Sequence, residues 1–219
     1  MTIFSRPSWE IAGRIAALEP GQIHLWRADL DALPCEPSLL DAAEQARYHS
    51  SRHPEAAQRF CAARGVLRRL LGAYLLVPPA DVPLSIAEGG KPQLAQPHRQ
   101  LQFNTSHSGA VLLIGLALEH PIGVDVEQRR EIPNAAQIAA RMFTEAPRDN
   151  EDFLRQWTAL EARQKCLGRG IFDQRSDAET LFQAAFEIDS QHLGALAWAC
   201  PPDSEAQLSC FAWHTDAFA

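Results

Sequence analysis

The sequence predicts an α+β protein made of two similar halves, with the functional site in the groove between them. Each half shows a strand, then a short helix, then a long helix with one apolar face. The matched segments are residues 23–30, 38–48 and 55–76 in the first half, and 122–127, 134–143 and 151–167 in the second. A groove between two packed halves is a natural ligand site. We therefore expect an N-terminal domain at residues 1–105 and a C-terminal domain at residues 106–219.

Composition excludes several classes of protein. With 46% hydrophobic and 21% charged residues in 219, the chain has the make-up of an ordinary globular protein. Its longest apolar run, residues 110–118, is too short to cross a bilayer. A net charge of −7 argues against general nucleic-acid binding but allows a local basic pocket. We expect a cytoplasmic protein with no membrane or nucleic-acid partner.

The cysteines and the lysines are distributed in an informative way. The five cysteines are scattered and show no metal-type pairing, so we expect free thiols. Among the 20 basic residues only Lys91 and Lys165 are lysines, which draws attention to both positions.

The remaining segments complete the expected fold. After a strand at 101–103, residues 104–109 are rich in hydroxyl groups and predict a loop. Residues 111–118 and 122–127 flank a turn and predict a buried hairpin. Three short strands are expected at 181–188, 195–199 and 207–213.

The strand Gly123–Glu127 carries two carboxylates. Because side chains alternate along a strand, Asp125 and Glu127 share one face. Two ionised carboxylates at close range favour a cation, and magnesium takes oxygen ligands readily. The alternative is a strand whose acidic residues simply face water.

A third carboxylate lies on the last long helix. Glu161 and Lys165 are one turn apart and share a face. Trp157 and Leu160 are expected to anchor this helix in the core, which would put Glu161 at the edge of the buried stripe. The alternative is a surface ion pair of small energetic value.

An anion site is expected from two segments together. The loop with His107 offers hydroxyls and backbone donors for phosphate oxygens, and guanidinium groups match a phosphate well. The helix at 55–76 is strongly basic through Arg59, Arg64, Arg68 and Arg69. A structural histidine and a solvated cationic face are the alternatives.

Three segments taken together resemble the signature of the Sfp-type 4′-phosphopantetheinyl transferases. They are Phe103–Gly109, Gly123–Glu127 and Trp157–Lys165, in that order and spacing, and both Gly90-Lys91-Pro92 and the Arg59 helix also fit. The family has two similar α+β halves with the active site between them. Its members transfer 4′-phosphopantetheine from coenzyme A to a serine of an acyl or peptidyl carrier protein and release 3′,5′-ADP.

The resemblance implies a role for each matched residue. Asp125, Glu127 and Glu161 would bind magnesium, Glu161 would accept the serine proton, and Lys165 would bind the phosphate under attack. Arg59 and His107 would hold the 3′-phosphate, with Ser106 on the pyrophosphate and Lys91 and Pro92 beside the adenine. The residues expected to contact coenzyme A are Arg59, Arg64, Lys91, Pro92, Ser106, His107 and Lys165.

Two positions depart from the family pattern. The family usually has a lysine before the metal-binding glutamate, where this chain has Leu160, and its N-terminal basic residues are represented only by Arg6, Arg14 or Arg27. We expect an active enzyme that is a monomer, because one chain supplies both halves of the groove. The competing functions are a non-catalytic binding protein for coenzyme A or a carrier protein, and a magnesium-dependent phosphohydrolase.

Overall fold

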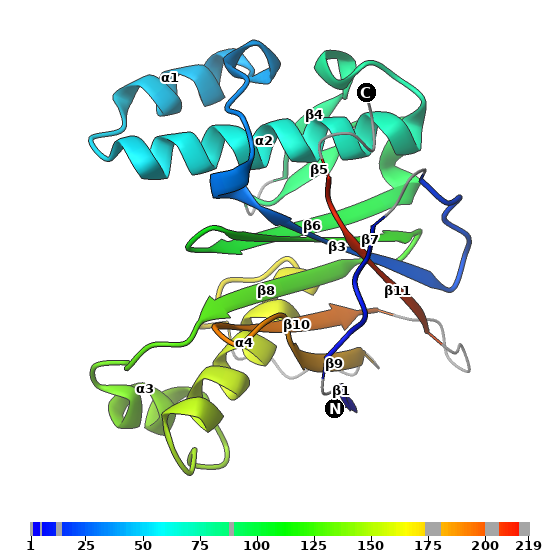
Figure 1. Ribbon diagram of the computed structural model, residues 1–219. Helices are drawn as coiled ribbons and strands as arrows, with labels where there is room; N and C mark the ends of the chain where they lie inside the picture. Colours follow the sequence, from blue (N-terminus) through cyan, green and yellow to red (C-terminus); the bar gives the residue numbers. More distant parts are fainter. Residues whose placement is uncertain are drawn as a thin grey trace.

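Two sheets packed face to face lie between two layers of helices in the computed structural model (Figure 1). The structure describes residues 2–4, 6–11, 15–87, 90–173, 181–199 and 206–214. Arg14 and one of the five cysteines, Cys200, lie outside these ranges. No helix in the described ranges is long and apolar enough to cross a membrane.

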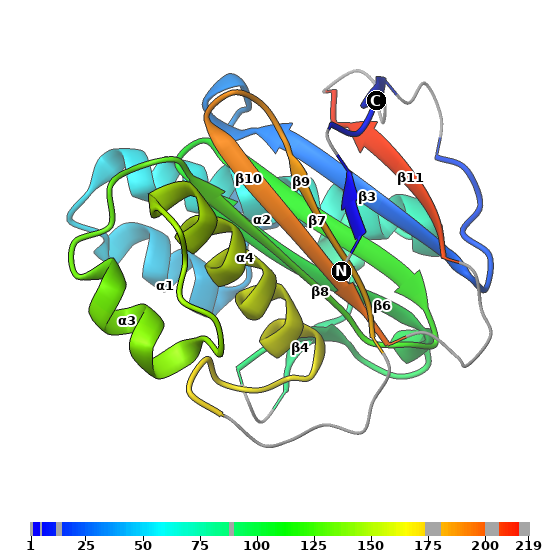
Figure 2. The ribbon, with the colours of Figure 1, turned by 90° about the horizontal axis from the view of Figure 1, so that it is seen from below.

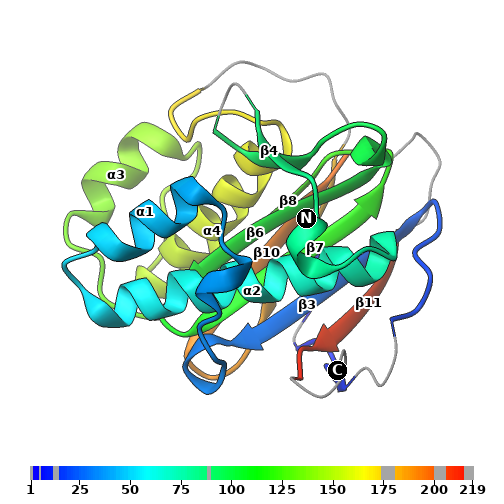
Figure 3. The same ribbon diagram turned by 90° about the horizontal axis from the view of Figure 1, so that it is seen from above.

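The first half contains a five-stranded sheet with two helices on its outer face. In Figure 3, α2 crosses this sheet and α1 lies alongside α2. The order of the strands is β2-β11-β3-β7-β6. The main elements are β3 (Gln22–Asp29), α1 (Ala42–Ser50), α2 (Pro54–Leu75), β6 (Leu101–Ser108) and β7 (Val111–Leu118), with β11 (Gln207–Ala212) beside β3 and β2 (Glu10–Ile11) at the edge. Shorter elements are β4 (Leu84–Ile86), β5 (Pro92–Leu94) and the 3₁₀ turns η1 (Leu30–Ala32), η2 (Pro37–Leu39), η3 (Pro79–Asp81) and η4 (His98–Gln100).

The second half repeats this plan with a four-stranded sheet of order β1-β9-β10-β8. In Figure 2, α4 lies across the outer face of this sheet, with α3 beside α4. Its elements are β8 (Ile122–Gln128), α3 (Ala135–Met142), α4 (Asn150–Cys166), β9 (Phe182–Glu187) and β10 (His192–Trp198), with β1 (Thr2–Phe4) at the edge.

The two halves share one topology. In each, the first strand pairs antiparallel with the third, and the third pairs antiparallel with the second: β3-β7-β6 and β8-β10-β9. In each, the short and long helices come between the first and second strands. The α+β prediction with two similar halves is confirmed. The expected boundary at residues 105 and 106 falls inside β6, and we infer that the halves meet at residues 119–121, between β7 and β8.

Three apolar layers hold the fold together. Outside the first sheet, α2 packs residues such as Leu67 and Leu70 against β3, β6 and β7. Between the sheets, Leu25 and Leu113 meet Val124 and other residues of the second sheet. Outside the second sheet, α4 packs on β10. Buried apolar surface stabilises a fold by about 25 cal/mol per Å², so these layers are the main source of stability.

The ends of the long helices follow from local sequence. Helix α1 begins with a capping box in which the side chain of Asp41 accepts from the amide of Glu44. Helix α2 starts at Pro54 and ends where Leu76 adopts a left-handed backbone. Helix α4 is capped by Asp149.

The predicted hairpin at 111–127 is wrong. Strand β7 pairs with β3 and β6, whereas β8 pairs with β10 in the other sheet. The two strands instead face each other across the interface between the sheets, and a Cβ at Gly115 would lie 2.7 Å from a methyl carbon of Val124. The predicted loop at 104–109 is also wrong, because β6 continues to Ser108.

The expectation of free thiols fails for two cysteines. Cys35 and Cys61 form a disulfide that joins the segment before α1 to α2, with 5.1 Å between their Cα atoms. Cys166 and Cys210 are buried thiols, in agreement with the expectation of thiols rather than disulfides. Because disulfides persist mainly in oxidising compartments, this pair bears on the cytoplasmic location, which stays a prediction.

Candidate active site

The site lies where β6 and β8, the edge strands of the two sheets, run beside each other. Side chains rather than a backbone ladder join them. The side-chain oxygen of buried Asn104 accepts from the amide of Val124 at 2.9 Å, and the Ser106 hydroxyl donates to Asp125 Oδ1 at 2.8 Å. Farther along, the Ser108 hydroxyl accepts from the amide of Gln128 at 3.0 Å. Alternate residues of β6 therefore hold the strand that carries the carboxylates.

A glycine brings α4 against this strand. A Cβ at Gly123 would clash with the carbonyl oxygen of Ala162 and the amide nitrogen of Cys166, so only glycine allows this approach. The helix is anchored by Phe153, Leu154 and other buried residues, while Trp157 and Leu160 are only half-buried. The close approach lets side chains of α4 reach Asp125.

Asp125, Glu161 and Lys165 form the centre of the site. The Lys165 ammonium donates to Asp125 Oδ1 at 2.6 Å and to the Ser106 hydroxyl at 2.9 Å, and it lies 3.7 Å from Glu161 Oε2. Asp125 is 2% exposed, and its Oδ2 has no hydrogen-bond partner among the described residues. A buried carboxylate oxygen without a donor is a position where a cation is stabilised.

The protonation of Asp125 reflects this setting. Burial, with a smaller contribution from the nearby Glu161 charge, raises the pKa of Asp125 to about 7. The Lys165 ammonium and the Ser106 hydrogen bond act in the opposite direction. A second cation at the free oxygen would favour the ionised form.

Glu127 turns toward other partners. Its Oε2 accepts from Nη1 of Arg130 at 2.7 Å and from the Ser108 hydroxyl at 3.5 Å. Within the described ranges no three acidic, histidine or cysteine side chains gather closely enough to hold a metal. The structure thus brings Asp125 and Glu161 together around Lys165, and Glu127 is held by Arg130.

Lys91 joins the two sides of the site rather than pointing at a ligand. Its ammonium donates to the carbonyl oxygens of Ile122 and Lys165, both at 2.9 Å, and burial lowers the pKa of Lys91. It therefore links the start of β8 to the end of α4. Pro92 lines a neighbouring cavity of about 300 Å³ together with Phe103 and Gly168.

Cations gather around His107. Burial lowers the pKa of His107, and the charges of four surrounding basic residues lower it further. In order of effect these are Arg47, Lys165, Arg59 and Arg64. Arg47, on α1, was missed from the sequence; its guanidinium lies 4.4 Å from the ring centroid of Phe60 on α2. Four cations near a neutral imidazole form a favourable setting for an anion.

The basic face of α2 is largely matched by acidic side chains. Arg59 binds Asp31 through two hydrogen bonds of 2.7 Å. The other three arginines of this helix also have carboxylate partners: Arg64 and Arg68 bind Glu44, and Arg69 binds Glu36. Arg68 is buried and stabilises the packing of α1 on α2, so this face is not simply a solvated cationic surface.

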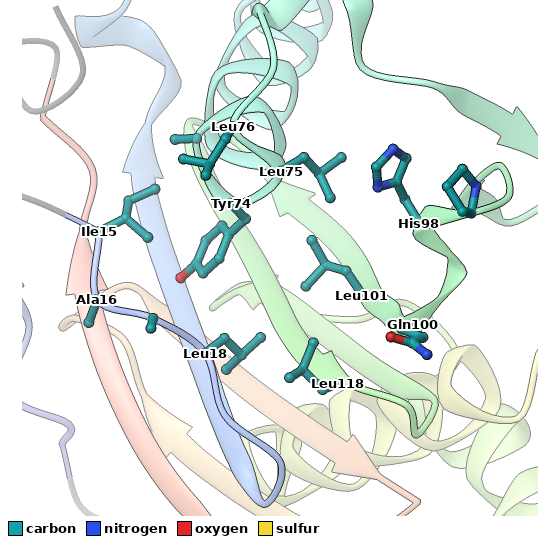
Figure 4. A pocket seen from close by; sticks show the side chains of 13 residues that line it. Ile15, Ala16, Leu18, Tyr74, Leu75, Leu76, His98, Gln100, Leu101 and Leu118 are labelled. Atoms are coloured by element: carbon teal, nitrogen blue, oxygen red, sulfur yellow. The ribbon is translucent and has the colours of Figure 1, made fainter.

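A separate cavity of about 500 Å³ is apolar in character. It lies at the C-terminal end of α2, where Figure 4 shows Ile15, Leu18, Leu101 and Leu118 around the Tyr74 ring. The Tyr74 hydroxyl already bonds the His24 ring at 2.6 Å and Trp26 Nε1 at 3.1 Å. This cavity does not suit a phosphate-rich ligand.

The N-terminal arginines have other partners. Arg6 pairs with Glu187 at 3.2 Å, and the guanidinium of Arg27 lies 5.1 Å from the ring centroid of Trp9. Neither contact involves the carboxylate site.

Sequence comparisons decide the family. The model of the 4′-phosphopantetheinyl transferase superfamily matches residues 121–206. The 4′-phosphopantetheinyl transferase HetI of Nostoc sp. is 34% identical over 168 residues, which cover 68% of this chain and 70% of that protein. The chain belongs to the 4′-phosphopantetheinyl transferases.

Other members of the family are similar over shorter segments. The 4′-phosphopantetheinyl transferase ffp of Bacillus subtilis is 29% identical over 147 residues, 61% of this chain and 62% of that protein. The human L-aminoadipate-semialdehyde dehydrogenase-phosphopantetheinyl transferase is 29% identical over 130 residues, 50% of this chain and 42% of that protein. The resemblance read from the three motifs is confirmed, and this phosphopantetheinyl transferase is an enzyme of the transferase class.

Proposed function

We propose that this phosphopantetheinyl transferase moves 4′-phosphopantetheine from coenzyme A to a serine of an apo acyl or peptidyl carrier protein. The products are the modified carrier protein and 3′,5′-ADP. The observation that supports this proposal most is the Asp125, Glu161 and Lys165 cluster, which lies within electrostatic range of the cations around His107. Carboxylates on one side and cations on the other suit a ligand with several phosphates.

Asp125 and Glu161 offer two of the carboxylates that a magnesium ion would need. Asp125 has a buried oxygen without a partner, and Glu161 lies on the same side of the cluster. Asp125, Glu127 and Glu161 would hold the ion, with Glu127 released from Arg130, and the ion would supply positive charge at the pyrophosphate.

The protein side chains account for the remaining steps. The serine oxygen forms a bond to the phosphorus of the phosphopantetheine group, and the bond from that phosphorus to the oxygen of 3′,5′-ADP breaks. Glu161 accepts the serine proton directly or through water, and Lys165 stabilises the charge of the departing 3′,5′-ADP. Arg59 and His107 hold the 3′-phosphate, aided by the nearby charge of Arg64.

Two residues assigned to coenzyme A from the sequence support the site in a different way. Ser106 donates its hydroxyl proton to Asp125 and accepts from Lys165, so it orders the cluster and can donate to the pyrophosphate only when its bond to Asp125 is released. Lys91 fixes the wall of the cavity that Pro92 lines, which we propose as the adenine site.

The products of one incubation test the proposal. The protein is mixed with coenzyme A, magnesium and an apo carrier protein, and the carrier protein is weighed by mass spectrometry. We expect the addition of one phosphopantetheine group and equal release of 3′,5′-ADP. Coenzyme A that is bound but intact would favour a binding protein, and free phosphate would favour a phosphohydrolase. An incubation with chelator in place of magnesium tests the metal requirement.

A further inference from the structure

We propose that Asp31 is a positioning residue, which holds the Arg59 guanidinium in place for the 3′-phosphate of the ligand. This inference rests on the proposed function, because Arg59 is assigned there to the 3′-phosphate. Asp31 Oδ1 accepts from Arg59 Nε and Asp31 Oδ2 accepts from Nη2, both at 2.7 Å.

This pairing leaves one side of the guanidinium free. A guanidinium carries five N–H donors in a planar fork, and a bidentate carboxylate uses two of them. Asp31 accepts from Nε and from one of the two N–H donors of Nη2, and in the described ranges Nη1 has no hydrogen-bond partner. The free donors of Nη1 and Nη2 form a second edge that a phosphate can engage. An arginine already held on one edge loses less side-chain entropy when it binds a ligand on the other.

The segment that carries Asp31 is itself fixed. The backbone amide of Asp31 donates to the Asp29 side chain at 3.1 Å. Leu30 is buried, and its amide donates to the carbonyl of Ala110 in the turn between β6 and β7 at 2.8 Å. On the C-terminal side of Asp31, the Cys35–Cys61 disulfide joins the chain to α2. Cys61 lies about half a helical turn after Arg59. These links hold the carboxylate in place and oppose a swing away from Arg59.

The direction of the effect follows from this arrangement. The side chain of Asp31 is 54% exposed, so water screens its charge and weakens its repulsion of a bound phosphate. The positive charges of Arg47, Arg64 and Lys165 lie within electrostatic range of His107, as Arg59 does, and they also attract a phosphate there. Orientation of Arg59 therefore outweighs the repulsion, and Asp31 strengthens recognition of the 3′-phosphate.

Equilibrium binding of two nucleotides tests this proposal without any transfer reaction. Calorimetry gives the dissociation constants of 3′,5′-ADP and of 5′-AMP, which lacks the 3′-phosphate, for the wild-type protein, Asp31→Ala, Arg59→Ala and the double variant. We expect wild type to prefer 3′,5′-ADP and Asp31→Ala to lower that preference about tenfold, since a hydrogen bond to a charged group is worth about that factor. In the Arg59→Ala background, Asp31→Ala should change nothing further, because Asp31 acts only through Arg59.

Several results would overturn the proposal. A preference that is unchanged or raised in Asp31→Ala would mean that Asp31 is neutral or competes with the phosphate. A further loss in the double variant, or a wild-type protein without any preference, would also contradict it. Asp31→Asn, which keeps the shape of the side chain and removes its charge, should give a smaller loss than Asp31→Ala. Asp81→Ala, at an acidic residue on η3, is the control and should keep the wild-type preference.

The two proposals fail in different ways. If the carrier protein gains no phosphopantetheine while the Asp31 variants lose their preference for 3′,5′-ADP, the transfer function fails and the role of Asp31 stands. If transfer occurs and the preference is the same in wild type and Asp31→Ala, only the role of Asp31 fails.

Discussion

Asp125 is the residue on which the site depends, because its burial conflicts with its charge. Its side chain is almost fully enclosed, one oxygen is bonded by Lys165 and Ser106, and the other lacks a partner among the described residues. Such a carboxylate weakens the fold when ionised and becomes favourable when a cation binds.

The stability of the metal-free protein should therefore depend on the protonation of Asp125. Its pKa is about 7 in the fold against an ordinary 3.8, so between these values the folded state binds more protons than the unfolded state. The free energy of unfolding should fall as pH rises through this window. Denaturant unfolding at about pH 5 and about pH 8, with chelator present, measures it. Asp125→Asn should lose this contribution, and an equal pH dependence in wild type and variant would contradict the assignment.

The positions of the site residues could be predicted from the sequence only where the regular repeat of a strand or a helix determines them. Asp125 lies on the predicted face of its strand, and Lys165 lies one helical turn from Glu161 as expected. The partners of the arginines could not be predicted, because Asp31, Glu36 and Glu44 reach α2 through tertiary packing. Arg47 was missed for the same reason: α1 brings it to the site.

At the scale of elements, the contact between β8 and α4 is the most sensitive part of the fold. Backbone atoms of α4 occupy the space that a side chain at position 123 would need, and backbone cannot move aside as a flexible side chain can. Gly123→Ala should lower the free energy of unfolding by about 3 kcal/mol, the upper range for overpacking, and should displace Lys165 from Asp125. Thermal unfolding measures the first effect. Gly170→Ala, where nothing lies within 4 Å of the added carbon, is the matched control, and equal stability of the two variants would contradict this account.

The disulfide should stabilise the first half. Cys35 and Cys61 are 26 residues apart, and closing a loop of that length in the unfolded chain is worth roughly 3–4 kcal/mol. Cys35→Ser should lower the free energy of unfolding by about this amount relative to oxidised wild type. Under a dithiol reductant the two proteins should unfold at similar denaturant concentrations. An equal stability of both proteins under oxidising conditions would show that this pair does not crosslink the chain in solution.

Helices were easier to predict than the pairing of strands. The long helices matched their predicted ranges to within a residue or two, because apolar periodicity and end signals are local. The partner of β8 is β10, about 70 residues farther along the chain, and no local pattern indicates that choice. Strand β6 was predicted too short, since Asn104, Ser106 and Ser108 alternate toward the site and a polar alternation of this kind is also typical of a loop.

At the scale of the whole molecule, the chain ends connect the two halves. Strand β11, near the C-terminus, pairs with β3 in the first sheet, and β1, near the N-terminus, pairs with β9 in the second. An apolar layer also joins the sheets. We expect one cooperative unfolding transition, with tryptophan fluorescence and far-ultraviolet circular dichroism giving the same midpoint. Two separate midpoints would mean that the halves are independent domains.

A single chain supplies both sides of the site, since β6 and α2 come from the first half and β8 and α4 from the second. We therefore predict a monomer. Sedimentation equilibrium should give the mass of one chain, 24.2 kDa, at all concentrations tested. A stable dimer would contradict this prediction.

The central claim is that the Asp125, Glu161 and Lys165 cluster performs the transfer. The most direct test compares the rate at which wild type and Asp125→Ala convert an apo carrier protein to its phosphopantetheine form, with circular dichroism confirming that both proteins are folded. We predict transfer by wild type and a rate at least about a hundredfold lower for Asp125→Ala, in the range that removal of a charge-stabilising group produces. A folded Asp125→Ala protein with the full wild-type rate would contradict the claim.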